Sequence, residues 1–259
     1  MMLEIKDLRK NFGGIKAVDG CSLNVKKGTI TGLIGPNGAG KTTLFNLITG
    51  FYKPNGGEIR FKGEQIEGLP PHKIFHKKIC RTFQVTRELK QMTVLENLMV
   101  IPKKQVGEKF WNPWLQPRIV RRQEKEIMEK ALNVLEFVDL IKLKDEYAGY
   151  LSSGQKKLLE LARTMMADPE LILLDEPGAG VNLTLMSKLV EYIKRLCQEK
   201  GVTFFLIEHD MDLVMNLCNP VIVMSNGKKL VEGTPDKIKK DERVLDAYLG
   251  GSKNGNPRS

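Results

Sequence analysis

Short apolar segments along the chain alternate with longer stretches in which apolar residues recur at helical spacing. Continuous apolar runs predict buried strands at residues 29–34, 171–175, 203–207 and 221–224. The stretches with helical spacing follow or separate these runs, at residues 41–49, 183–199 and 210–217. Strands that alternate with helices in this way favour an α/β fold built on a mainly parallel sheet.

The first sixty or so residues have a different pattern. Segments 3–8, 21–25 and 58–61 have the composition of short strands, and they are joined by glycine-rich turns such as Gly13-Gly14. This part of the chain therefore predicts a small antiparallel sheet at the N-terminus.

Residues 85–150 are mostly helical in pattern. Within them, apolar residues gather on one helical face: Ile127, Met128, Ala131, Leu132, Leu135 and Val138. The last residues, 251–259, are rich in Gly, Ser, Asn and Pro without periodicity, and we expect a disordered tail there.

The composition is that of a globular protein, with 41% hydrophobic and 28% charged residues among 259. No apolar run approaches the roughly 20 residues that cross a bilayer. Glu4, Lys6 and Asp7 stand where a signal peptide needs an apolar stretch, so we expect a protein retained in the cytosol. The cysteines have no paired spacing and predict buried thiols rather than zinc ligands or disulfides: Cys21, Cys80, Cys197 and Cys218.

The net charge is +10, from 41 basic and 31 acidic residues. Such a charge suits nucleic acid, an anionic membrane surface, or solubility alone, and most lysines are spread along the chain. One denser basic section, residues 103–122, also holds both tryptophans, Trp111 and Trp114. This amphipathic mix is compatible with a membrane interface or a permease loop, and equally with a solvated insertion.

A glycine-rich loop follows the strand predicted at residues 29–34. It matches G-x-x-x-x-G-K-[ST] through Gly35, Pro36, Asn37, Gly38, Ala39, Gly40, Lys41 and Thr42, with Thr43 next. Glycines let backbone N–H groups turn inward around a phosphate, and the following helix adds its positive N-terminal end. Lys41 supplies a charge for the β- and γ-phosphates, and the Thr42 hydroxyl can bind Mg²⁺. The loop predicts a nucleoside triphosphate site.

Two carboxylates, Asp175 and Glu176, come directly after the apolar run that begins at Leu171. A buried strand delivers them to the C-terminal edge of the sheet, beside the phosphate loop. We expect Asp175 to hold Mg²⁺ through water and Glu176 to polarise the attacking water.

Upstream of these carboxylates stands Leu151-Ser152-Ser153-Gly154-Gln155, followed by an amphipathic stretch. It resembles the signature motif of ABC ATPases, Leu-Ser-Gly-Gly-Gln, with Ser153 in place of the first glycine. A serine that simply caps a helix would give the same pattern, and the two interpretations are compatible. Because Gly154 is retained, we expect it, rather than Ser153, to need a positive φ and to lie close to the nucleotide.

The other elements of that family follow in order. Gln84, in Arg81-Thr82-Phe83-Gln84, resembles the Q-loop glutamine, which would reach the metal and sense the γ-phosphate. His209 resembles the switch histidine that contacts the γ-phosphate, and Phe12 stands where the family has an aromatic residue stacked on adenine. Asn182 occupies the D-loop, where many members have Asp.

The resemblance covers nearly the whole chain and implies a P-loop ABC ATPase with a RecA-like core, an N-terminal antiparallel β subdomain and an inserted helical subdomain. It divides a single domain, 1–250, into a core (1–84 and 156–250) and a helical subdomain (85–155). Several stretches look like the branched-chain, or hydrophobic, amino-acid uptake subgroup, among them Gly50-Phe51-Tyr52-Lys53-Pro54 and Ala179-Gly180-Val181-Asn182. A lipopolysaccharide-export ATPase shares some of these features, so export of lipid or lipopolysaccharide stays open.

The resemblance also implies how the protein works. ATP and Mg²⁺ would bind the phosphate loop of one subunit and be covered by Ser152–Gln155 of a second, identical or different, ATPase subunit. Integral membrane permeases and an extracytoplasmic substrate-binding protein would complete the system, with this chain in the cytoplasm, peripheral on the inner face of the cell membrane. A soluble non-transport ABC ATPase is an alternative, a GTPase is disfavoured because the Asn/Thr-Lys-x-Asp motif is missing, and no nucleic acid partner is expected.

Overall fold

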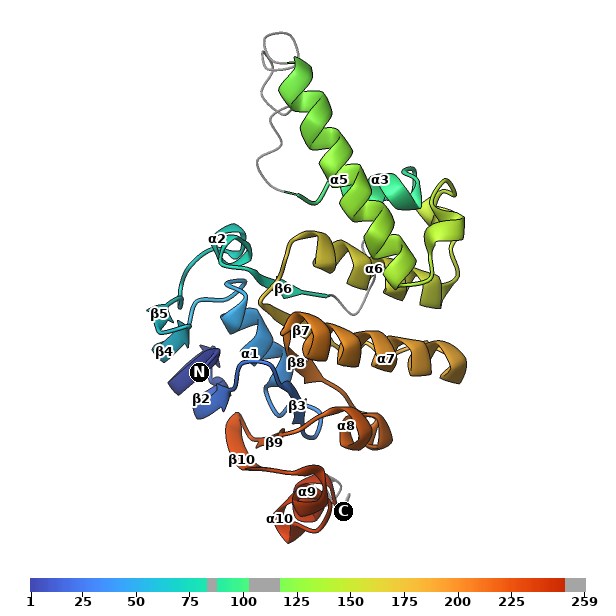
Figure 1. Cartoon of the computed structure of the whole chain (residues 1–259). Helices are drawn as coiled ribbons and strands as arrows, with labels where there is room; N and C mark the ends of the chain where they lie inside the picture. Colours follow the sequence, from blue (N-terminus) through green and yellow to red (C-terminus); the bar gives the residue numbers. More distant parts are fainter. Residues whose placement is uncertain (83–87, 103–116, 250–259) are drawn as a thin grey trace. The chain divides into compact units, whose positions relative to one another are not determined.

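The computed structural model describes residues 1–82, 88–102 and 117–249, shown as a ribbon in Figure 1. The chain divides into two compact units. The first contains residues 1–81, 170–178 and 193 onward, and the second contains residues 82–169 and 179–192.

An antiparallel sheet begins the first unit. Among the described residues it has four strands in the order β2-β1-β4-β5. They are β1 (Leu3–Phe12), β2 (Ile15–Val25), β4 (Gly56–Phe61) and β5 (Glu64–Gln65). The predicted small antiparallel sheet is confirmed, but β1 and β2 are longer than predicted. The reason is that β1 beyond Leu8 and the start of β2 are mostly exposed, so apolar residues do not mark them as strands.

A second sheet lies at the centre of this unit. Among the described residues its order is β10-β9-β3-β8-β7-β6, and every pair is parallel except β10 with β9. Its strands are β3 (Ile30–Ile34), β6 (Ile79–Arg81), β7 (Leu171–Asp175), β8 (Thr203–Ile207), β9 (Val221–Ser225) and β10 (Lys228–Gly233). The prediction of a mainly parallel sheet is therefore confirmed. Strands β7 and β8 are buried at every position, as their continuous apolar runs indicated.

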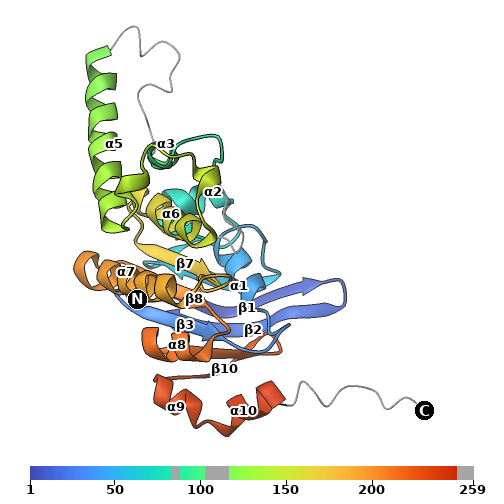
Figure 2. The same ribbon diagram turned by 90° about the vertical axis from the view of Figure 1, so that its right-hand side faces the viewer.

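Helices cover this sheet, as Figure 2 shows for the strands and helices of the first unit. They are α1 (Lys41–Ile48), α2 (Pro71–His76), α8 (Met211–Leu217), α9 (Pro235–Lys239), α10 (Glu242–Leu249) and the later part of α7 (Leu183–Lys200). Helix α1 contributes Leu44 and Phe45 to a core shared with both sheets, and the Phe45 ring lies 5.1 Å from that of Phe205 on β8. This packing fixes the start of α1, and with it the phosphate loop, against the parallel sheet.

The second unit is largely helical. It contains α3 (Val94–Met99), α5 (Pro117–Phe137), η2 (Ile141–Leu143), η3 (Ala148–Tyr150), α6 (Ser153–Met166) and the first part of α7. Helices α3, α5 and α6 pack on one another. Because α6 buries Leu158, Leu159 and Leu161 in this packing, it groups with the helical unit, whereas the expected division placed most of it in the core.

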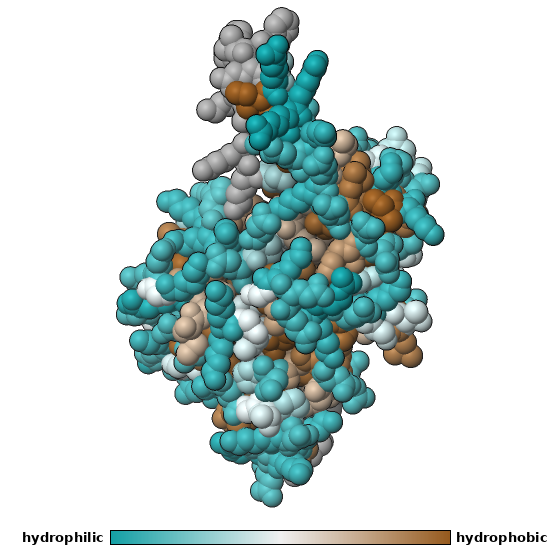
Figure 3. All heavy atoms as spheres, in the orientation of Figure 1, coloured by the Kyte–Doolittle hydropathy of each residue, from teal (hydrophilic) through white to brown (hydrophobic). Residues whose placement is uncertain are grey.

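In the part of the chain that is described, the helices are too short or too polar to pass through a bilayer. Hydrophilic side chains cover most of the face drawn in Figure 3.

Candidate functional site

The phosphate loop leaves β3 and enters α1 at Lys41. Gly40 caps the helix with φ 96°, and no side chain satisfies the first N–H groups. A Cβ at Gly40 would lie 2.3 Å from the Ala17 carbonyl oxygen, and one at Gly35 would lie 2.1 Å from that of Met224. Only glycine fits either position, so the loop keeps its backbone N–H groups and the positive end of α1 open for an anion.

Lys41 folds back over this loop. Its side chain is 6% exposed, and its Nζ donates to the carbonyl oxygens of Gly35 at 2.7 Å and Pro36 at 3.0 Å. Burial lowers the pKa of Lys41, while the charges of Glu176 and Asp175 act in the opposite direction. A cation held by two neutral carbonyls is well placed to exchange them for phosphate oxygens.

A hollow of about 380 Å³ opens beside the loop. Its lining brings the phosphate loop together with Glu176 and His209, as the sequence predicted for one nucleotide site. The lining residues are Ile15, Lys16, Ala17, Asn37, Gly38, Ala39, Gly40, Lys41, Thr42, Thr43, Glu176 and His209. Three of them, at the start of β2, were missed in the sequence analysis because no motif marks them.

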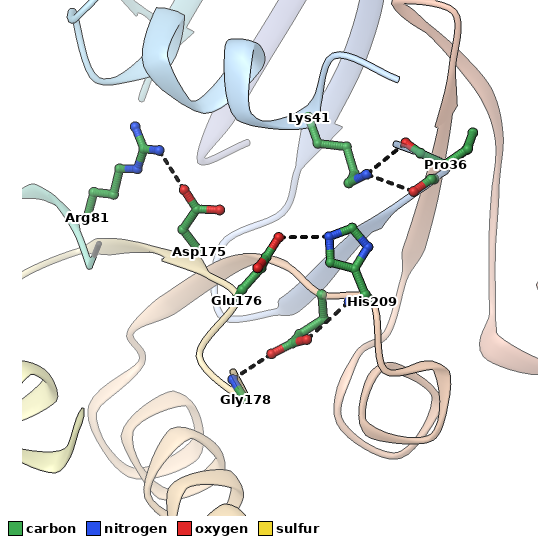
Figure 4. A network of polar contacts seen from close by, with 9 residues as sticks. Pro36, Lys41, Arg81, Asp175, Glu176, Gly178 and His209 are labelled. Carbon is green, nitrogen blue, oxygen red and sulfur yellow. Dashed lines mark hydrogen bonds and ion pairs between the residues drawn. The ribbon is translucent and has the colours of Figure 1, made fainter. Parts of the chain in front are cut away.

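Glu176 and His209 both line this hollow, and their side chains point toward each other (Figure 4). The Glu176 Oε1 and His209 Nε2 atoms are 2.7 Å apart. Glu176 follows β7 with φ 49°, a left-handed conformation that costs a non-glycine residue about 1–3 kcal/mol. Its N–H donates to the Ile207 carbonyl at 3.0 Å, which ties this conformation to the end of β8.

Asp175 makes a buried ion pair with Arg81. The Arg81 Nη2 and Asp175 Oδ2 atoms are 2.6 Å apart, and the two side chains are 7% and 8% exposed. Arg81 also donates to Asn46 Oδ1 on α1 at 2.6 Å. The Thr42 hydroxyl and the Asp175 carboxylate are oxygen donors of the kind Mg²⁺ prefers, so the residues present fit that ion.

Phe12 lies at the end of the β1–β2 hairpin. It pairs across the strands with Ile15, which lines the hollow, and its ring is 43% exposed. The Tyr52 ring meets it edge-on at 5.2 Å, and the Lys10 Nζ lies 5.1 Å from its centre. The predicted stacking residue is thus an accessible aromatic ring beside the loop.

The signature residues belong to the second unit. Ser152 caps α6: its hydroxyl accepts from the Gln155 N–H, and the Gln155 side chain accepts from the Ser152 N–H. The expectation that Ser153 adopts an ordinary conformation is confirmed, since it is the first residue of α6 and has no positive φ.

The expectation that Gly154 needs a positive φ was wrong, whereas its closeness to the nucleotide of a second subunit stays a prediction. It is the second residue of α6 and has no positive φ. A Cβ there would lie 1.6 Å from Leu185 Cδ2, so Gly154 is needed for packing against α7 within the second unit.

Asn182, the predicted D-loop residue, caps α7. Its Oδ1 accepts from the Leu185 N–H at 2.9 Å. Asn and Asp both cap helix N-termini well, so Asn182 can make the capping bond that an Asp would make at this position.

Three predictions concern residues outside those described. Gln84 lies there, as do residues 103–116 of the basic section and the tail from 250. The described remainder of the basic section is the exposed start of α5, which carries Arg118, Arg121 and Arg122.

Two further residues near the site were missed in the sequence analysis. Arg81 was named there only as part of the segment that ends at Gln84, and Glu208, directly before His209, was not singled out. A charged residue directly at the end of an apolar run is a weak signal in both cases, because such residues usually face solvent. Here both are mostly buried, and both bind groups on a strand or loop distant in sequence.

Two family models match the chain. The model described as ABC transporter matches residues 18–179, and the model described as branched-chain amino acid ATP-binding cassette transporter matches residues 228–254. The first match covers the phosphate loop, the signature and both carboxylates, and the second covers β10, α9 and α10.

Similar proteins span almost the same length. The chain is 45% identical over 249 residues to the high-affinity branched-chain amino acid transport ATP-binding protein BraF of Pseudomonas aeruginosa, covering 96% of this chain and 98% of that one. It is 40% identical, with the same coverage, to the corresponding protein LivG of Escherichia coli. Among solved structures, it resembles the ADP conformation of an ATP-binding cassette of an ABC transporter, with 40% identity, a TM-score of 0.83, and coverage of 96% of this chain and 98% of that one.

Proposed function

The chain belongs to the ABC transporter family as an ATP-binding cassette, and on that premise we propose that it binds Mg·ATP in the hollow beside the phosphate loop and hydrolyses it to drive transport. The observation that carries the proposal is the shared lining of this hollow. It joins the phosphate loop to Glu176 and His209, which come from three separate parts of the chain.

Binding rests on the loop and α1. The N–H groups at the start of α1 and the Lys41 ammonium bind the β- and γ-phosphates, and Lys41 exchanges the Gly35 and Pro36 carbonyls for phosphate oxygens. Phe12 offers its exposed ring to the adenine base. Thr42, Asp175 and Gln84 would hold Mg²⁺, which neutralises charge on the phosphates when it is bound.

Hydrolysis rests on Glu176. Its carboxylate accepts a proton from the attacking water as a general base, a role worth about 10²–10⁴-fold in rate. His209 orients that carboxylate through the 2.7 Å contact and reaches the γ-phosphate side of the hollow. The strained backbone of Glu176 keeps the side chain directed into the hollow.

A second ATPase subunit would complete the site. Ser152, Ser153, Gly154 and Gln155 stand at the start of a helix whose N-terminal end offers N–H groups and hydroxyls but no carboxylate. Such an end suits the γ-phosphate of ATP that another subunit holds. ATP binding would therefore bring two subunits together, and hydrolysis would release them.

The proposed cargo is a branched-chain amino acid. Support comes from the family model at residues 228–254 and from the names of the similar proteins. The chain would act on the cytoplasmic face of the membrane with permease subunits, and a substrate-binding protein on the other side would deliver the cargo.

The proposal is tested with purified protein and Lys41→Ala. We expect the wild-type protein to hydrolyse ATP in the presence of Mg²⁺, and Lys41→Ala to lose affinity for a fluorescent ATP analogue by at least tenfold. Lys27→Ala, at an exposed lysine away from the hollow, is the matched control and should bind normally. Equal affinity in both variants would contradict the assigned site.

The cargo is tested separately by uptake of radiolabelled leucine, isoleucine and valine in a strain that lacks this gene. Restoration of uptake by the wild-type gene and not by Lys41→Ala is the expected result. Unchanged uptake in the deletion strain would refute the cargo and leave the ATPase assignment intact.

A further inference from the structure

A buried glutamate lies beside the two residues assigned to hydrolysis. Glu208 separates Ile207, the last residue of β8, from His209, and it is 4% exposed. Burial raises the pKa of Glu208, and N–H groups that bind its oxygens act in the opposite direction. A buried carboxyl group lowers stability unless its oxygens accept hydrogen bonds. The hydrogen bonds of Glu208 therefore explain why it can be buried.

Both oxygens of Glu208 accept backbone N–H bonds. Oε1 accepts from Gly178 at 2.7 Å, and Oε2 accepts from His209 at 3.1 Å. Gly178 lies two residues beyond Glu176, and its bond is drawn in Figure 4. One side chain therefore binds the loop that carries the general base and the backbone of the histidine that contacts that base.

These bonds belong to a set of three connections between the two loops. The Glu176 N–H donates to the Ile207 carbonyl at 3.0 Å, and the Glu176 carboxylate lies 2.7 Å from His209 Nε2. Glu208 supplies the third connection through Gly178, two residues C-terminal to Glu176. The left-handed conformation of Glu176 costs free energy, and bonds from Glu176 to Ile207 and from Gly178 to Glu208 hold this part of the loop in place.

We propose that Glu208 is a positioning residue for ATP hydrolysis, which fixes the Glu176 loop and His209 as one unit. This inference rests on the proposed function, because it assigns Glu208 a role through Glu176. It does not require Glu208 to touch ATP, since both of its oxygens bind backbone groups.

Glu208→Gln is the sharpest test, because glutamine has nearly the same shape. Its side chain has a single acceptor oxygen, so one of the two N–H groups would face an NH₂ group instead of an acceptor. We expect kcat for ATP to fall at least tenfold, while KM and the affinity for the ATP analogue stay within about twofold. The Gly178 or His209 amide hydrogen should exchange with solvent at least tenfold faster in the nucleotide-free variant.

Two controls separate this role from general destabilisation. Glu242→Gln changes an exposed glutamate on α10 and should leave all these quantities unchanged. Ile5→Val removes one methylene group from the buried face of β1, which lowers stability without touching either loop, and should keep kcat.

These experiments separate a failure of the positioning role of Glu208 from a failure of the proposed ATPase function. If the wild-type protein hydrolyses ATP and Glu208→Gln keeps its kcat, the positioning role is refuted while the proposed function stands. A parallel fall of kcat and ATP affinity, or normal exchange at both amides, would also overturn the role. If the wild-type protein does not hydrolyse ATP, the proposed function itself fails.

Discussion

Gly154→Ala adds one methyl group at the second position of α6. The new Cβ would lie 1.6 Å from Leu185 Cδ2 and 3.0 Å from its Cγ, far inside the roughly 3.5–4.0 Å at which carbon atoms pack best. The Leu185 side chain must therefore rotate away. It is half-buried, so it can move toward solvent without displacing the backbone of α7.

Two opposing terms set the size of the effect. Alanine stabilises a helix by roughly 0.5–1 kcal/mol over glycine. Overpacking costs about 1–3 kcal/mol. We expect a net loss of about 1 kcal/mol in the free energy of unfolding.

In a Leu185→Ala background the overlap is gone, and Gly154→Ala should then stabilise the protein by roughly 0.5–1 kcal/mol. The two changes are therefore coupled by about 2 kcal/mol, which is within the range found for residues in contact.

Urea denaturation of the nucleotide-free protein, followed by circular dichroism, measures all four variants of this cycle. ATP is absent, so any coupling must come from the contact between Gly154 and Leu185. If Gly154→Ala changes stability equally in both backgrounds, the packing explanation is refuted. An unchanged stability together with lost activity in the assembled transporter would instead restore the role toward nucleotide that the sequence analysis expected.

Three further predictions concern charge, the signature and the metal. Arg81→Met should lower the free energy of unfolding by about 3–5 kcal/mol, because it leaves Asp175 buried without its partner. Adding Asp175→Asn to this variant should recover part of that loss in the same urea assay. Ser153→Gly should change the ATPase rate of the assembled transporter only a few-fold, equivalent to about 1 kcal/mol in the barrier, because Ser153 has an ordinary helical conformation; a collapse of the rate would contradict this. EDTA should stop ATP turnover and excess Mg²⁺ should restore it, whereas turnover that persists in EDTA would exclude the assigned metal role.

The elements best predicted from the sequence were those buried on all sides. Strands β7 and β8 are continuous apolar runs, and the phosphate loop has a motif whose glycines are required by local backbone geometry. The exposed end of the β1–β2 hairpin was missed because polar residues there carry no signal of a strand.

The side-chain pairs around the site could not be predicted in the same way. Arg81 and Asp175 are 94 residues apart and meet because β6 lies next to β7 in the sheet, an order that no local pattern encodes. Glu208 meets Gly178 for the same reason, through the neighbouring strands β7 and β8. The contact of Gly154 with Leu185 likewise joins two helices, and the motif alone suggested a different cause.

The proposed mechanism depends on Glu176 as the general base of an ATPase whose phosphates are bound by the phosphate loop. The most direct test is the ATP turnover of Glu176→Gln, measured beside its affinity for Mg·ATP. We expect turnover to fall at least about 100-fold with affinity unchanged, since the amide keeps the shape of the side chain but cannot accept the proton. Turnover at the wild-type rate would contradict the assignment of Glu176 as the general base.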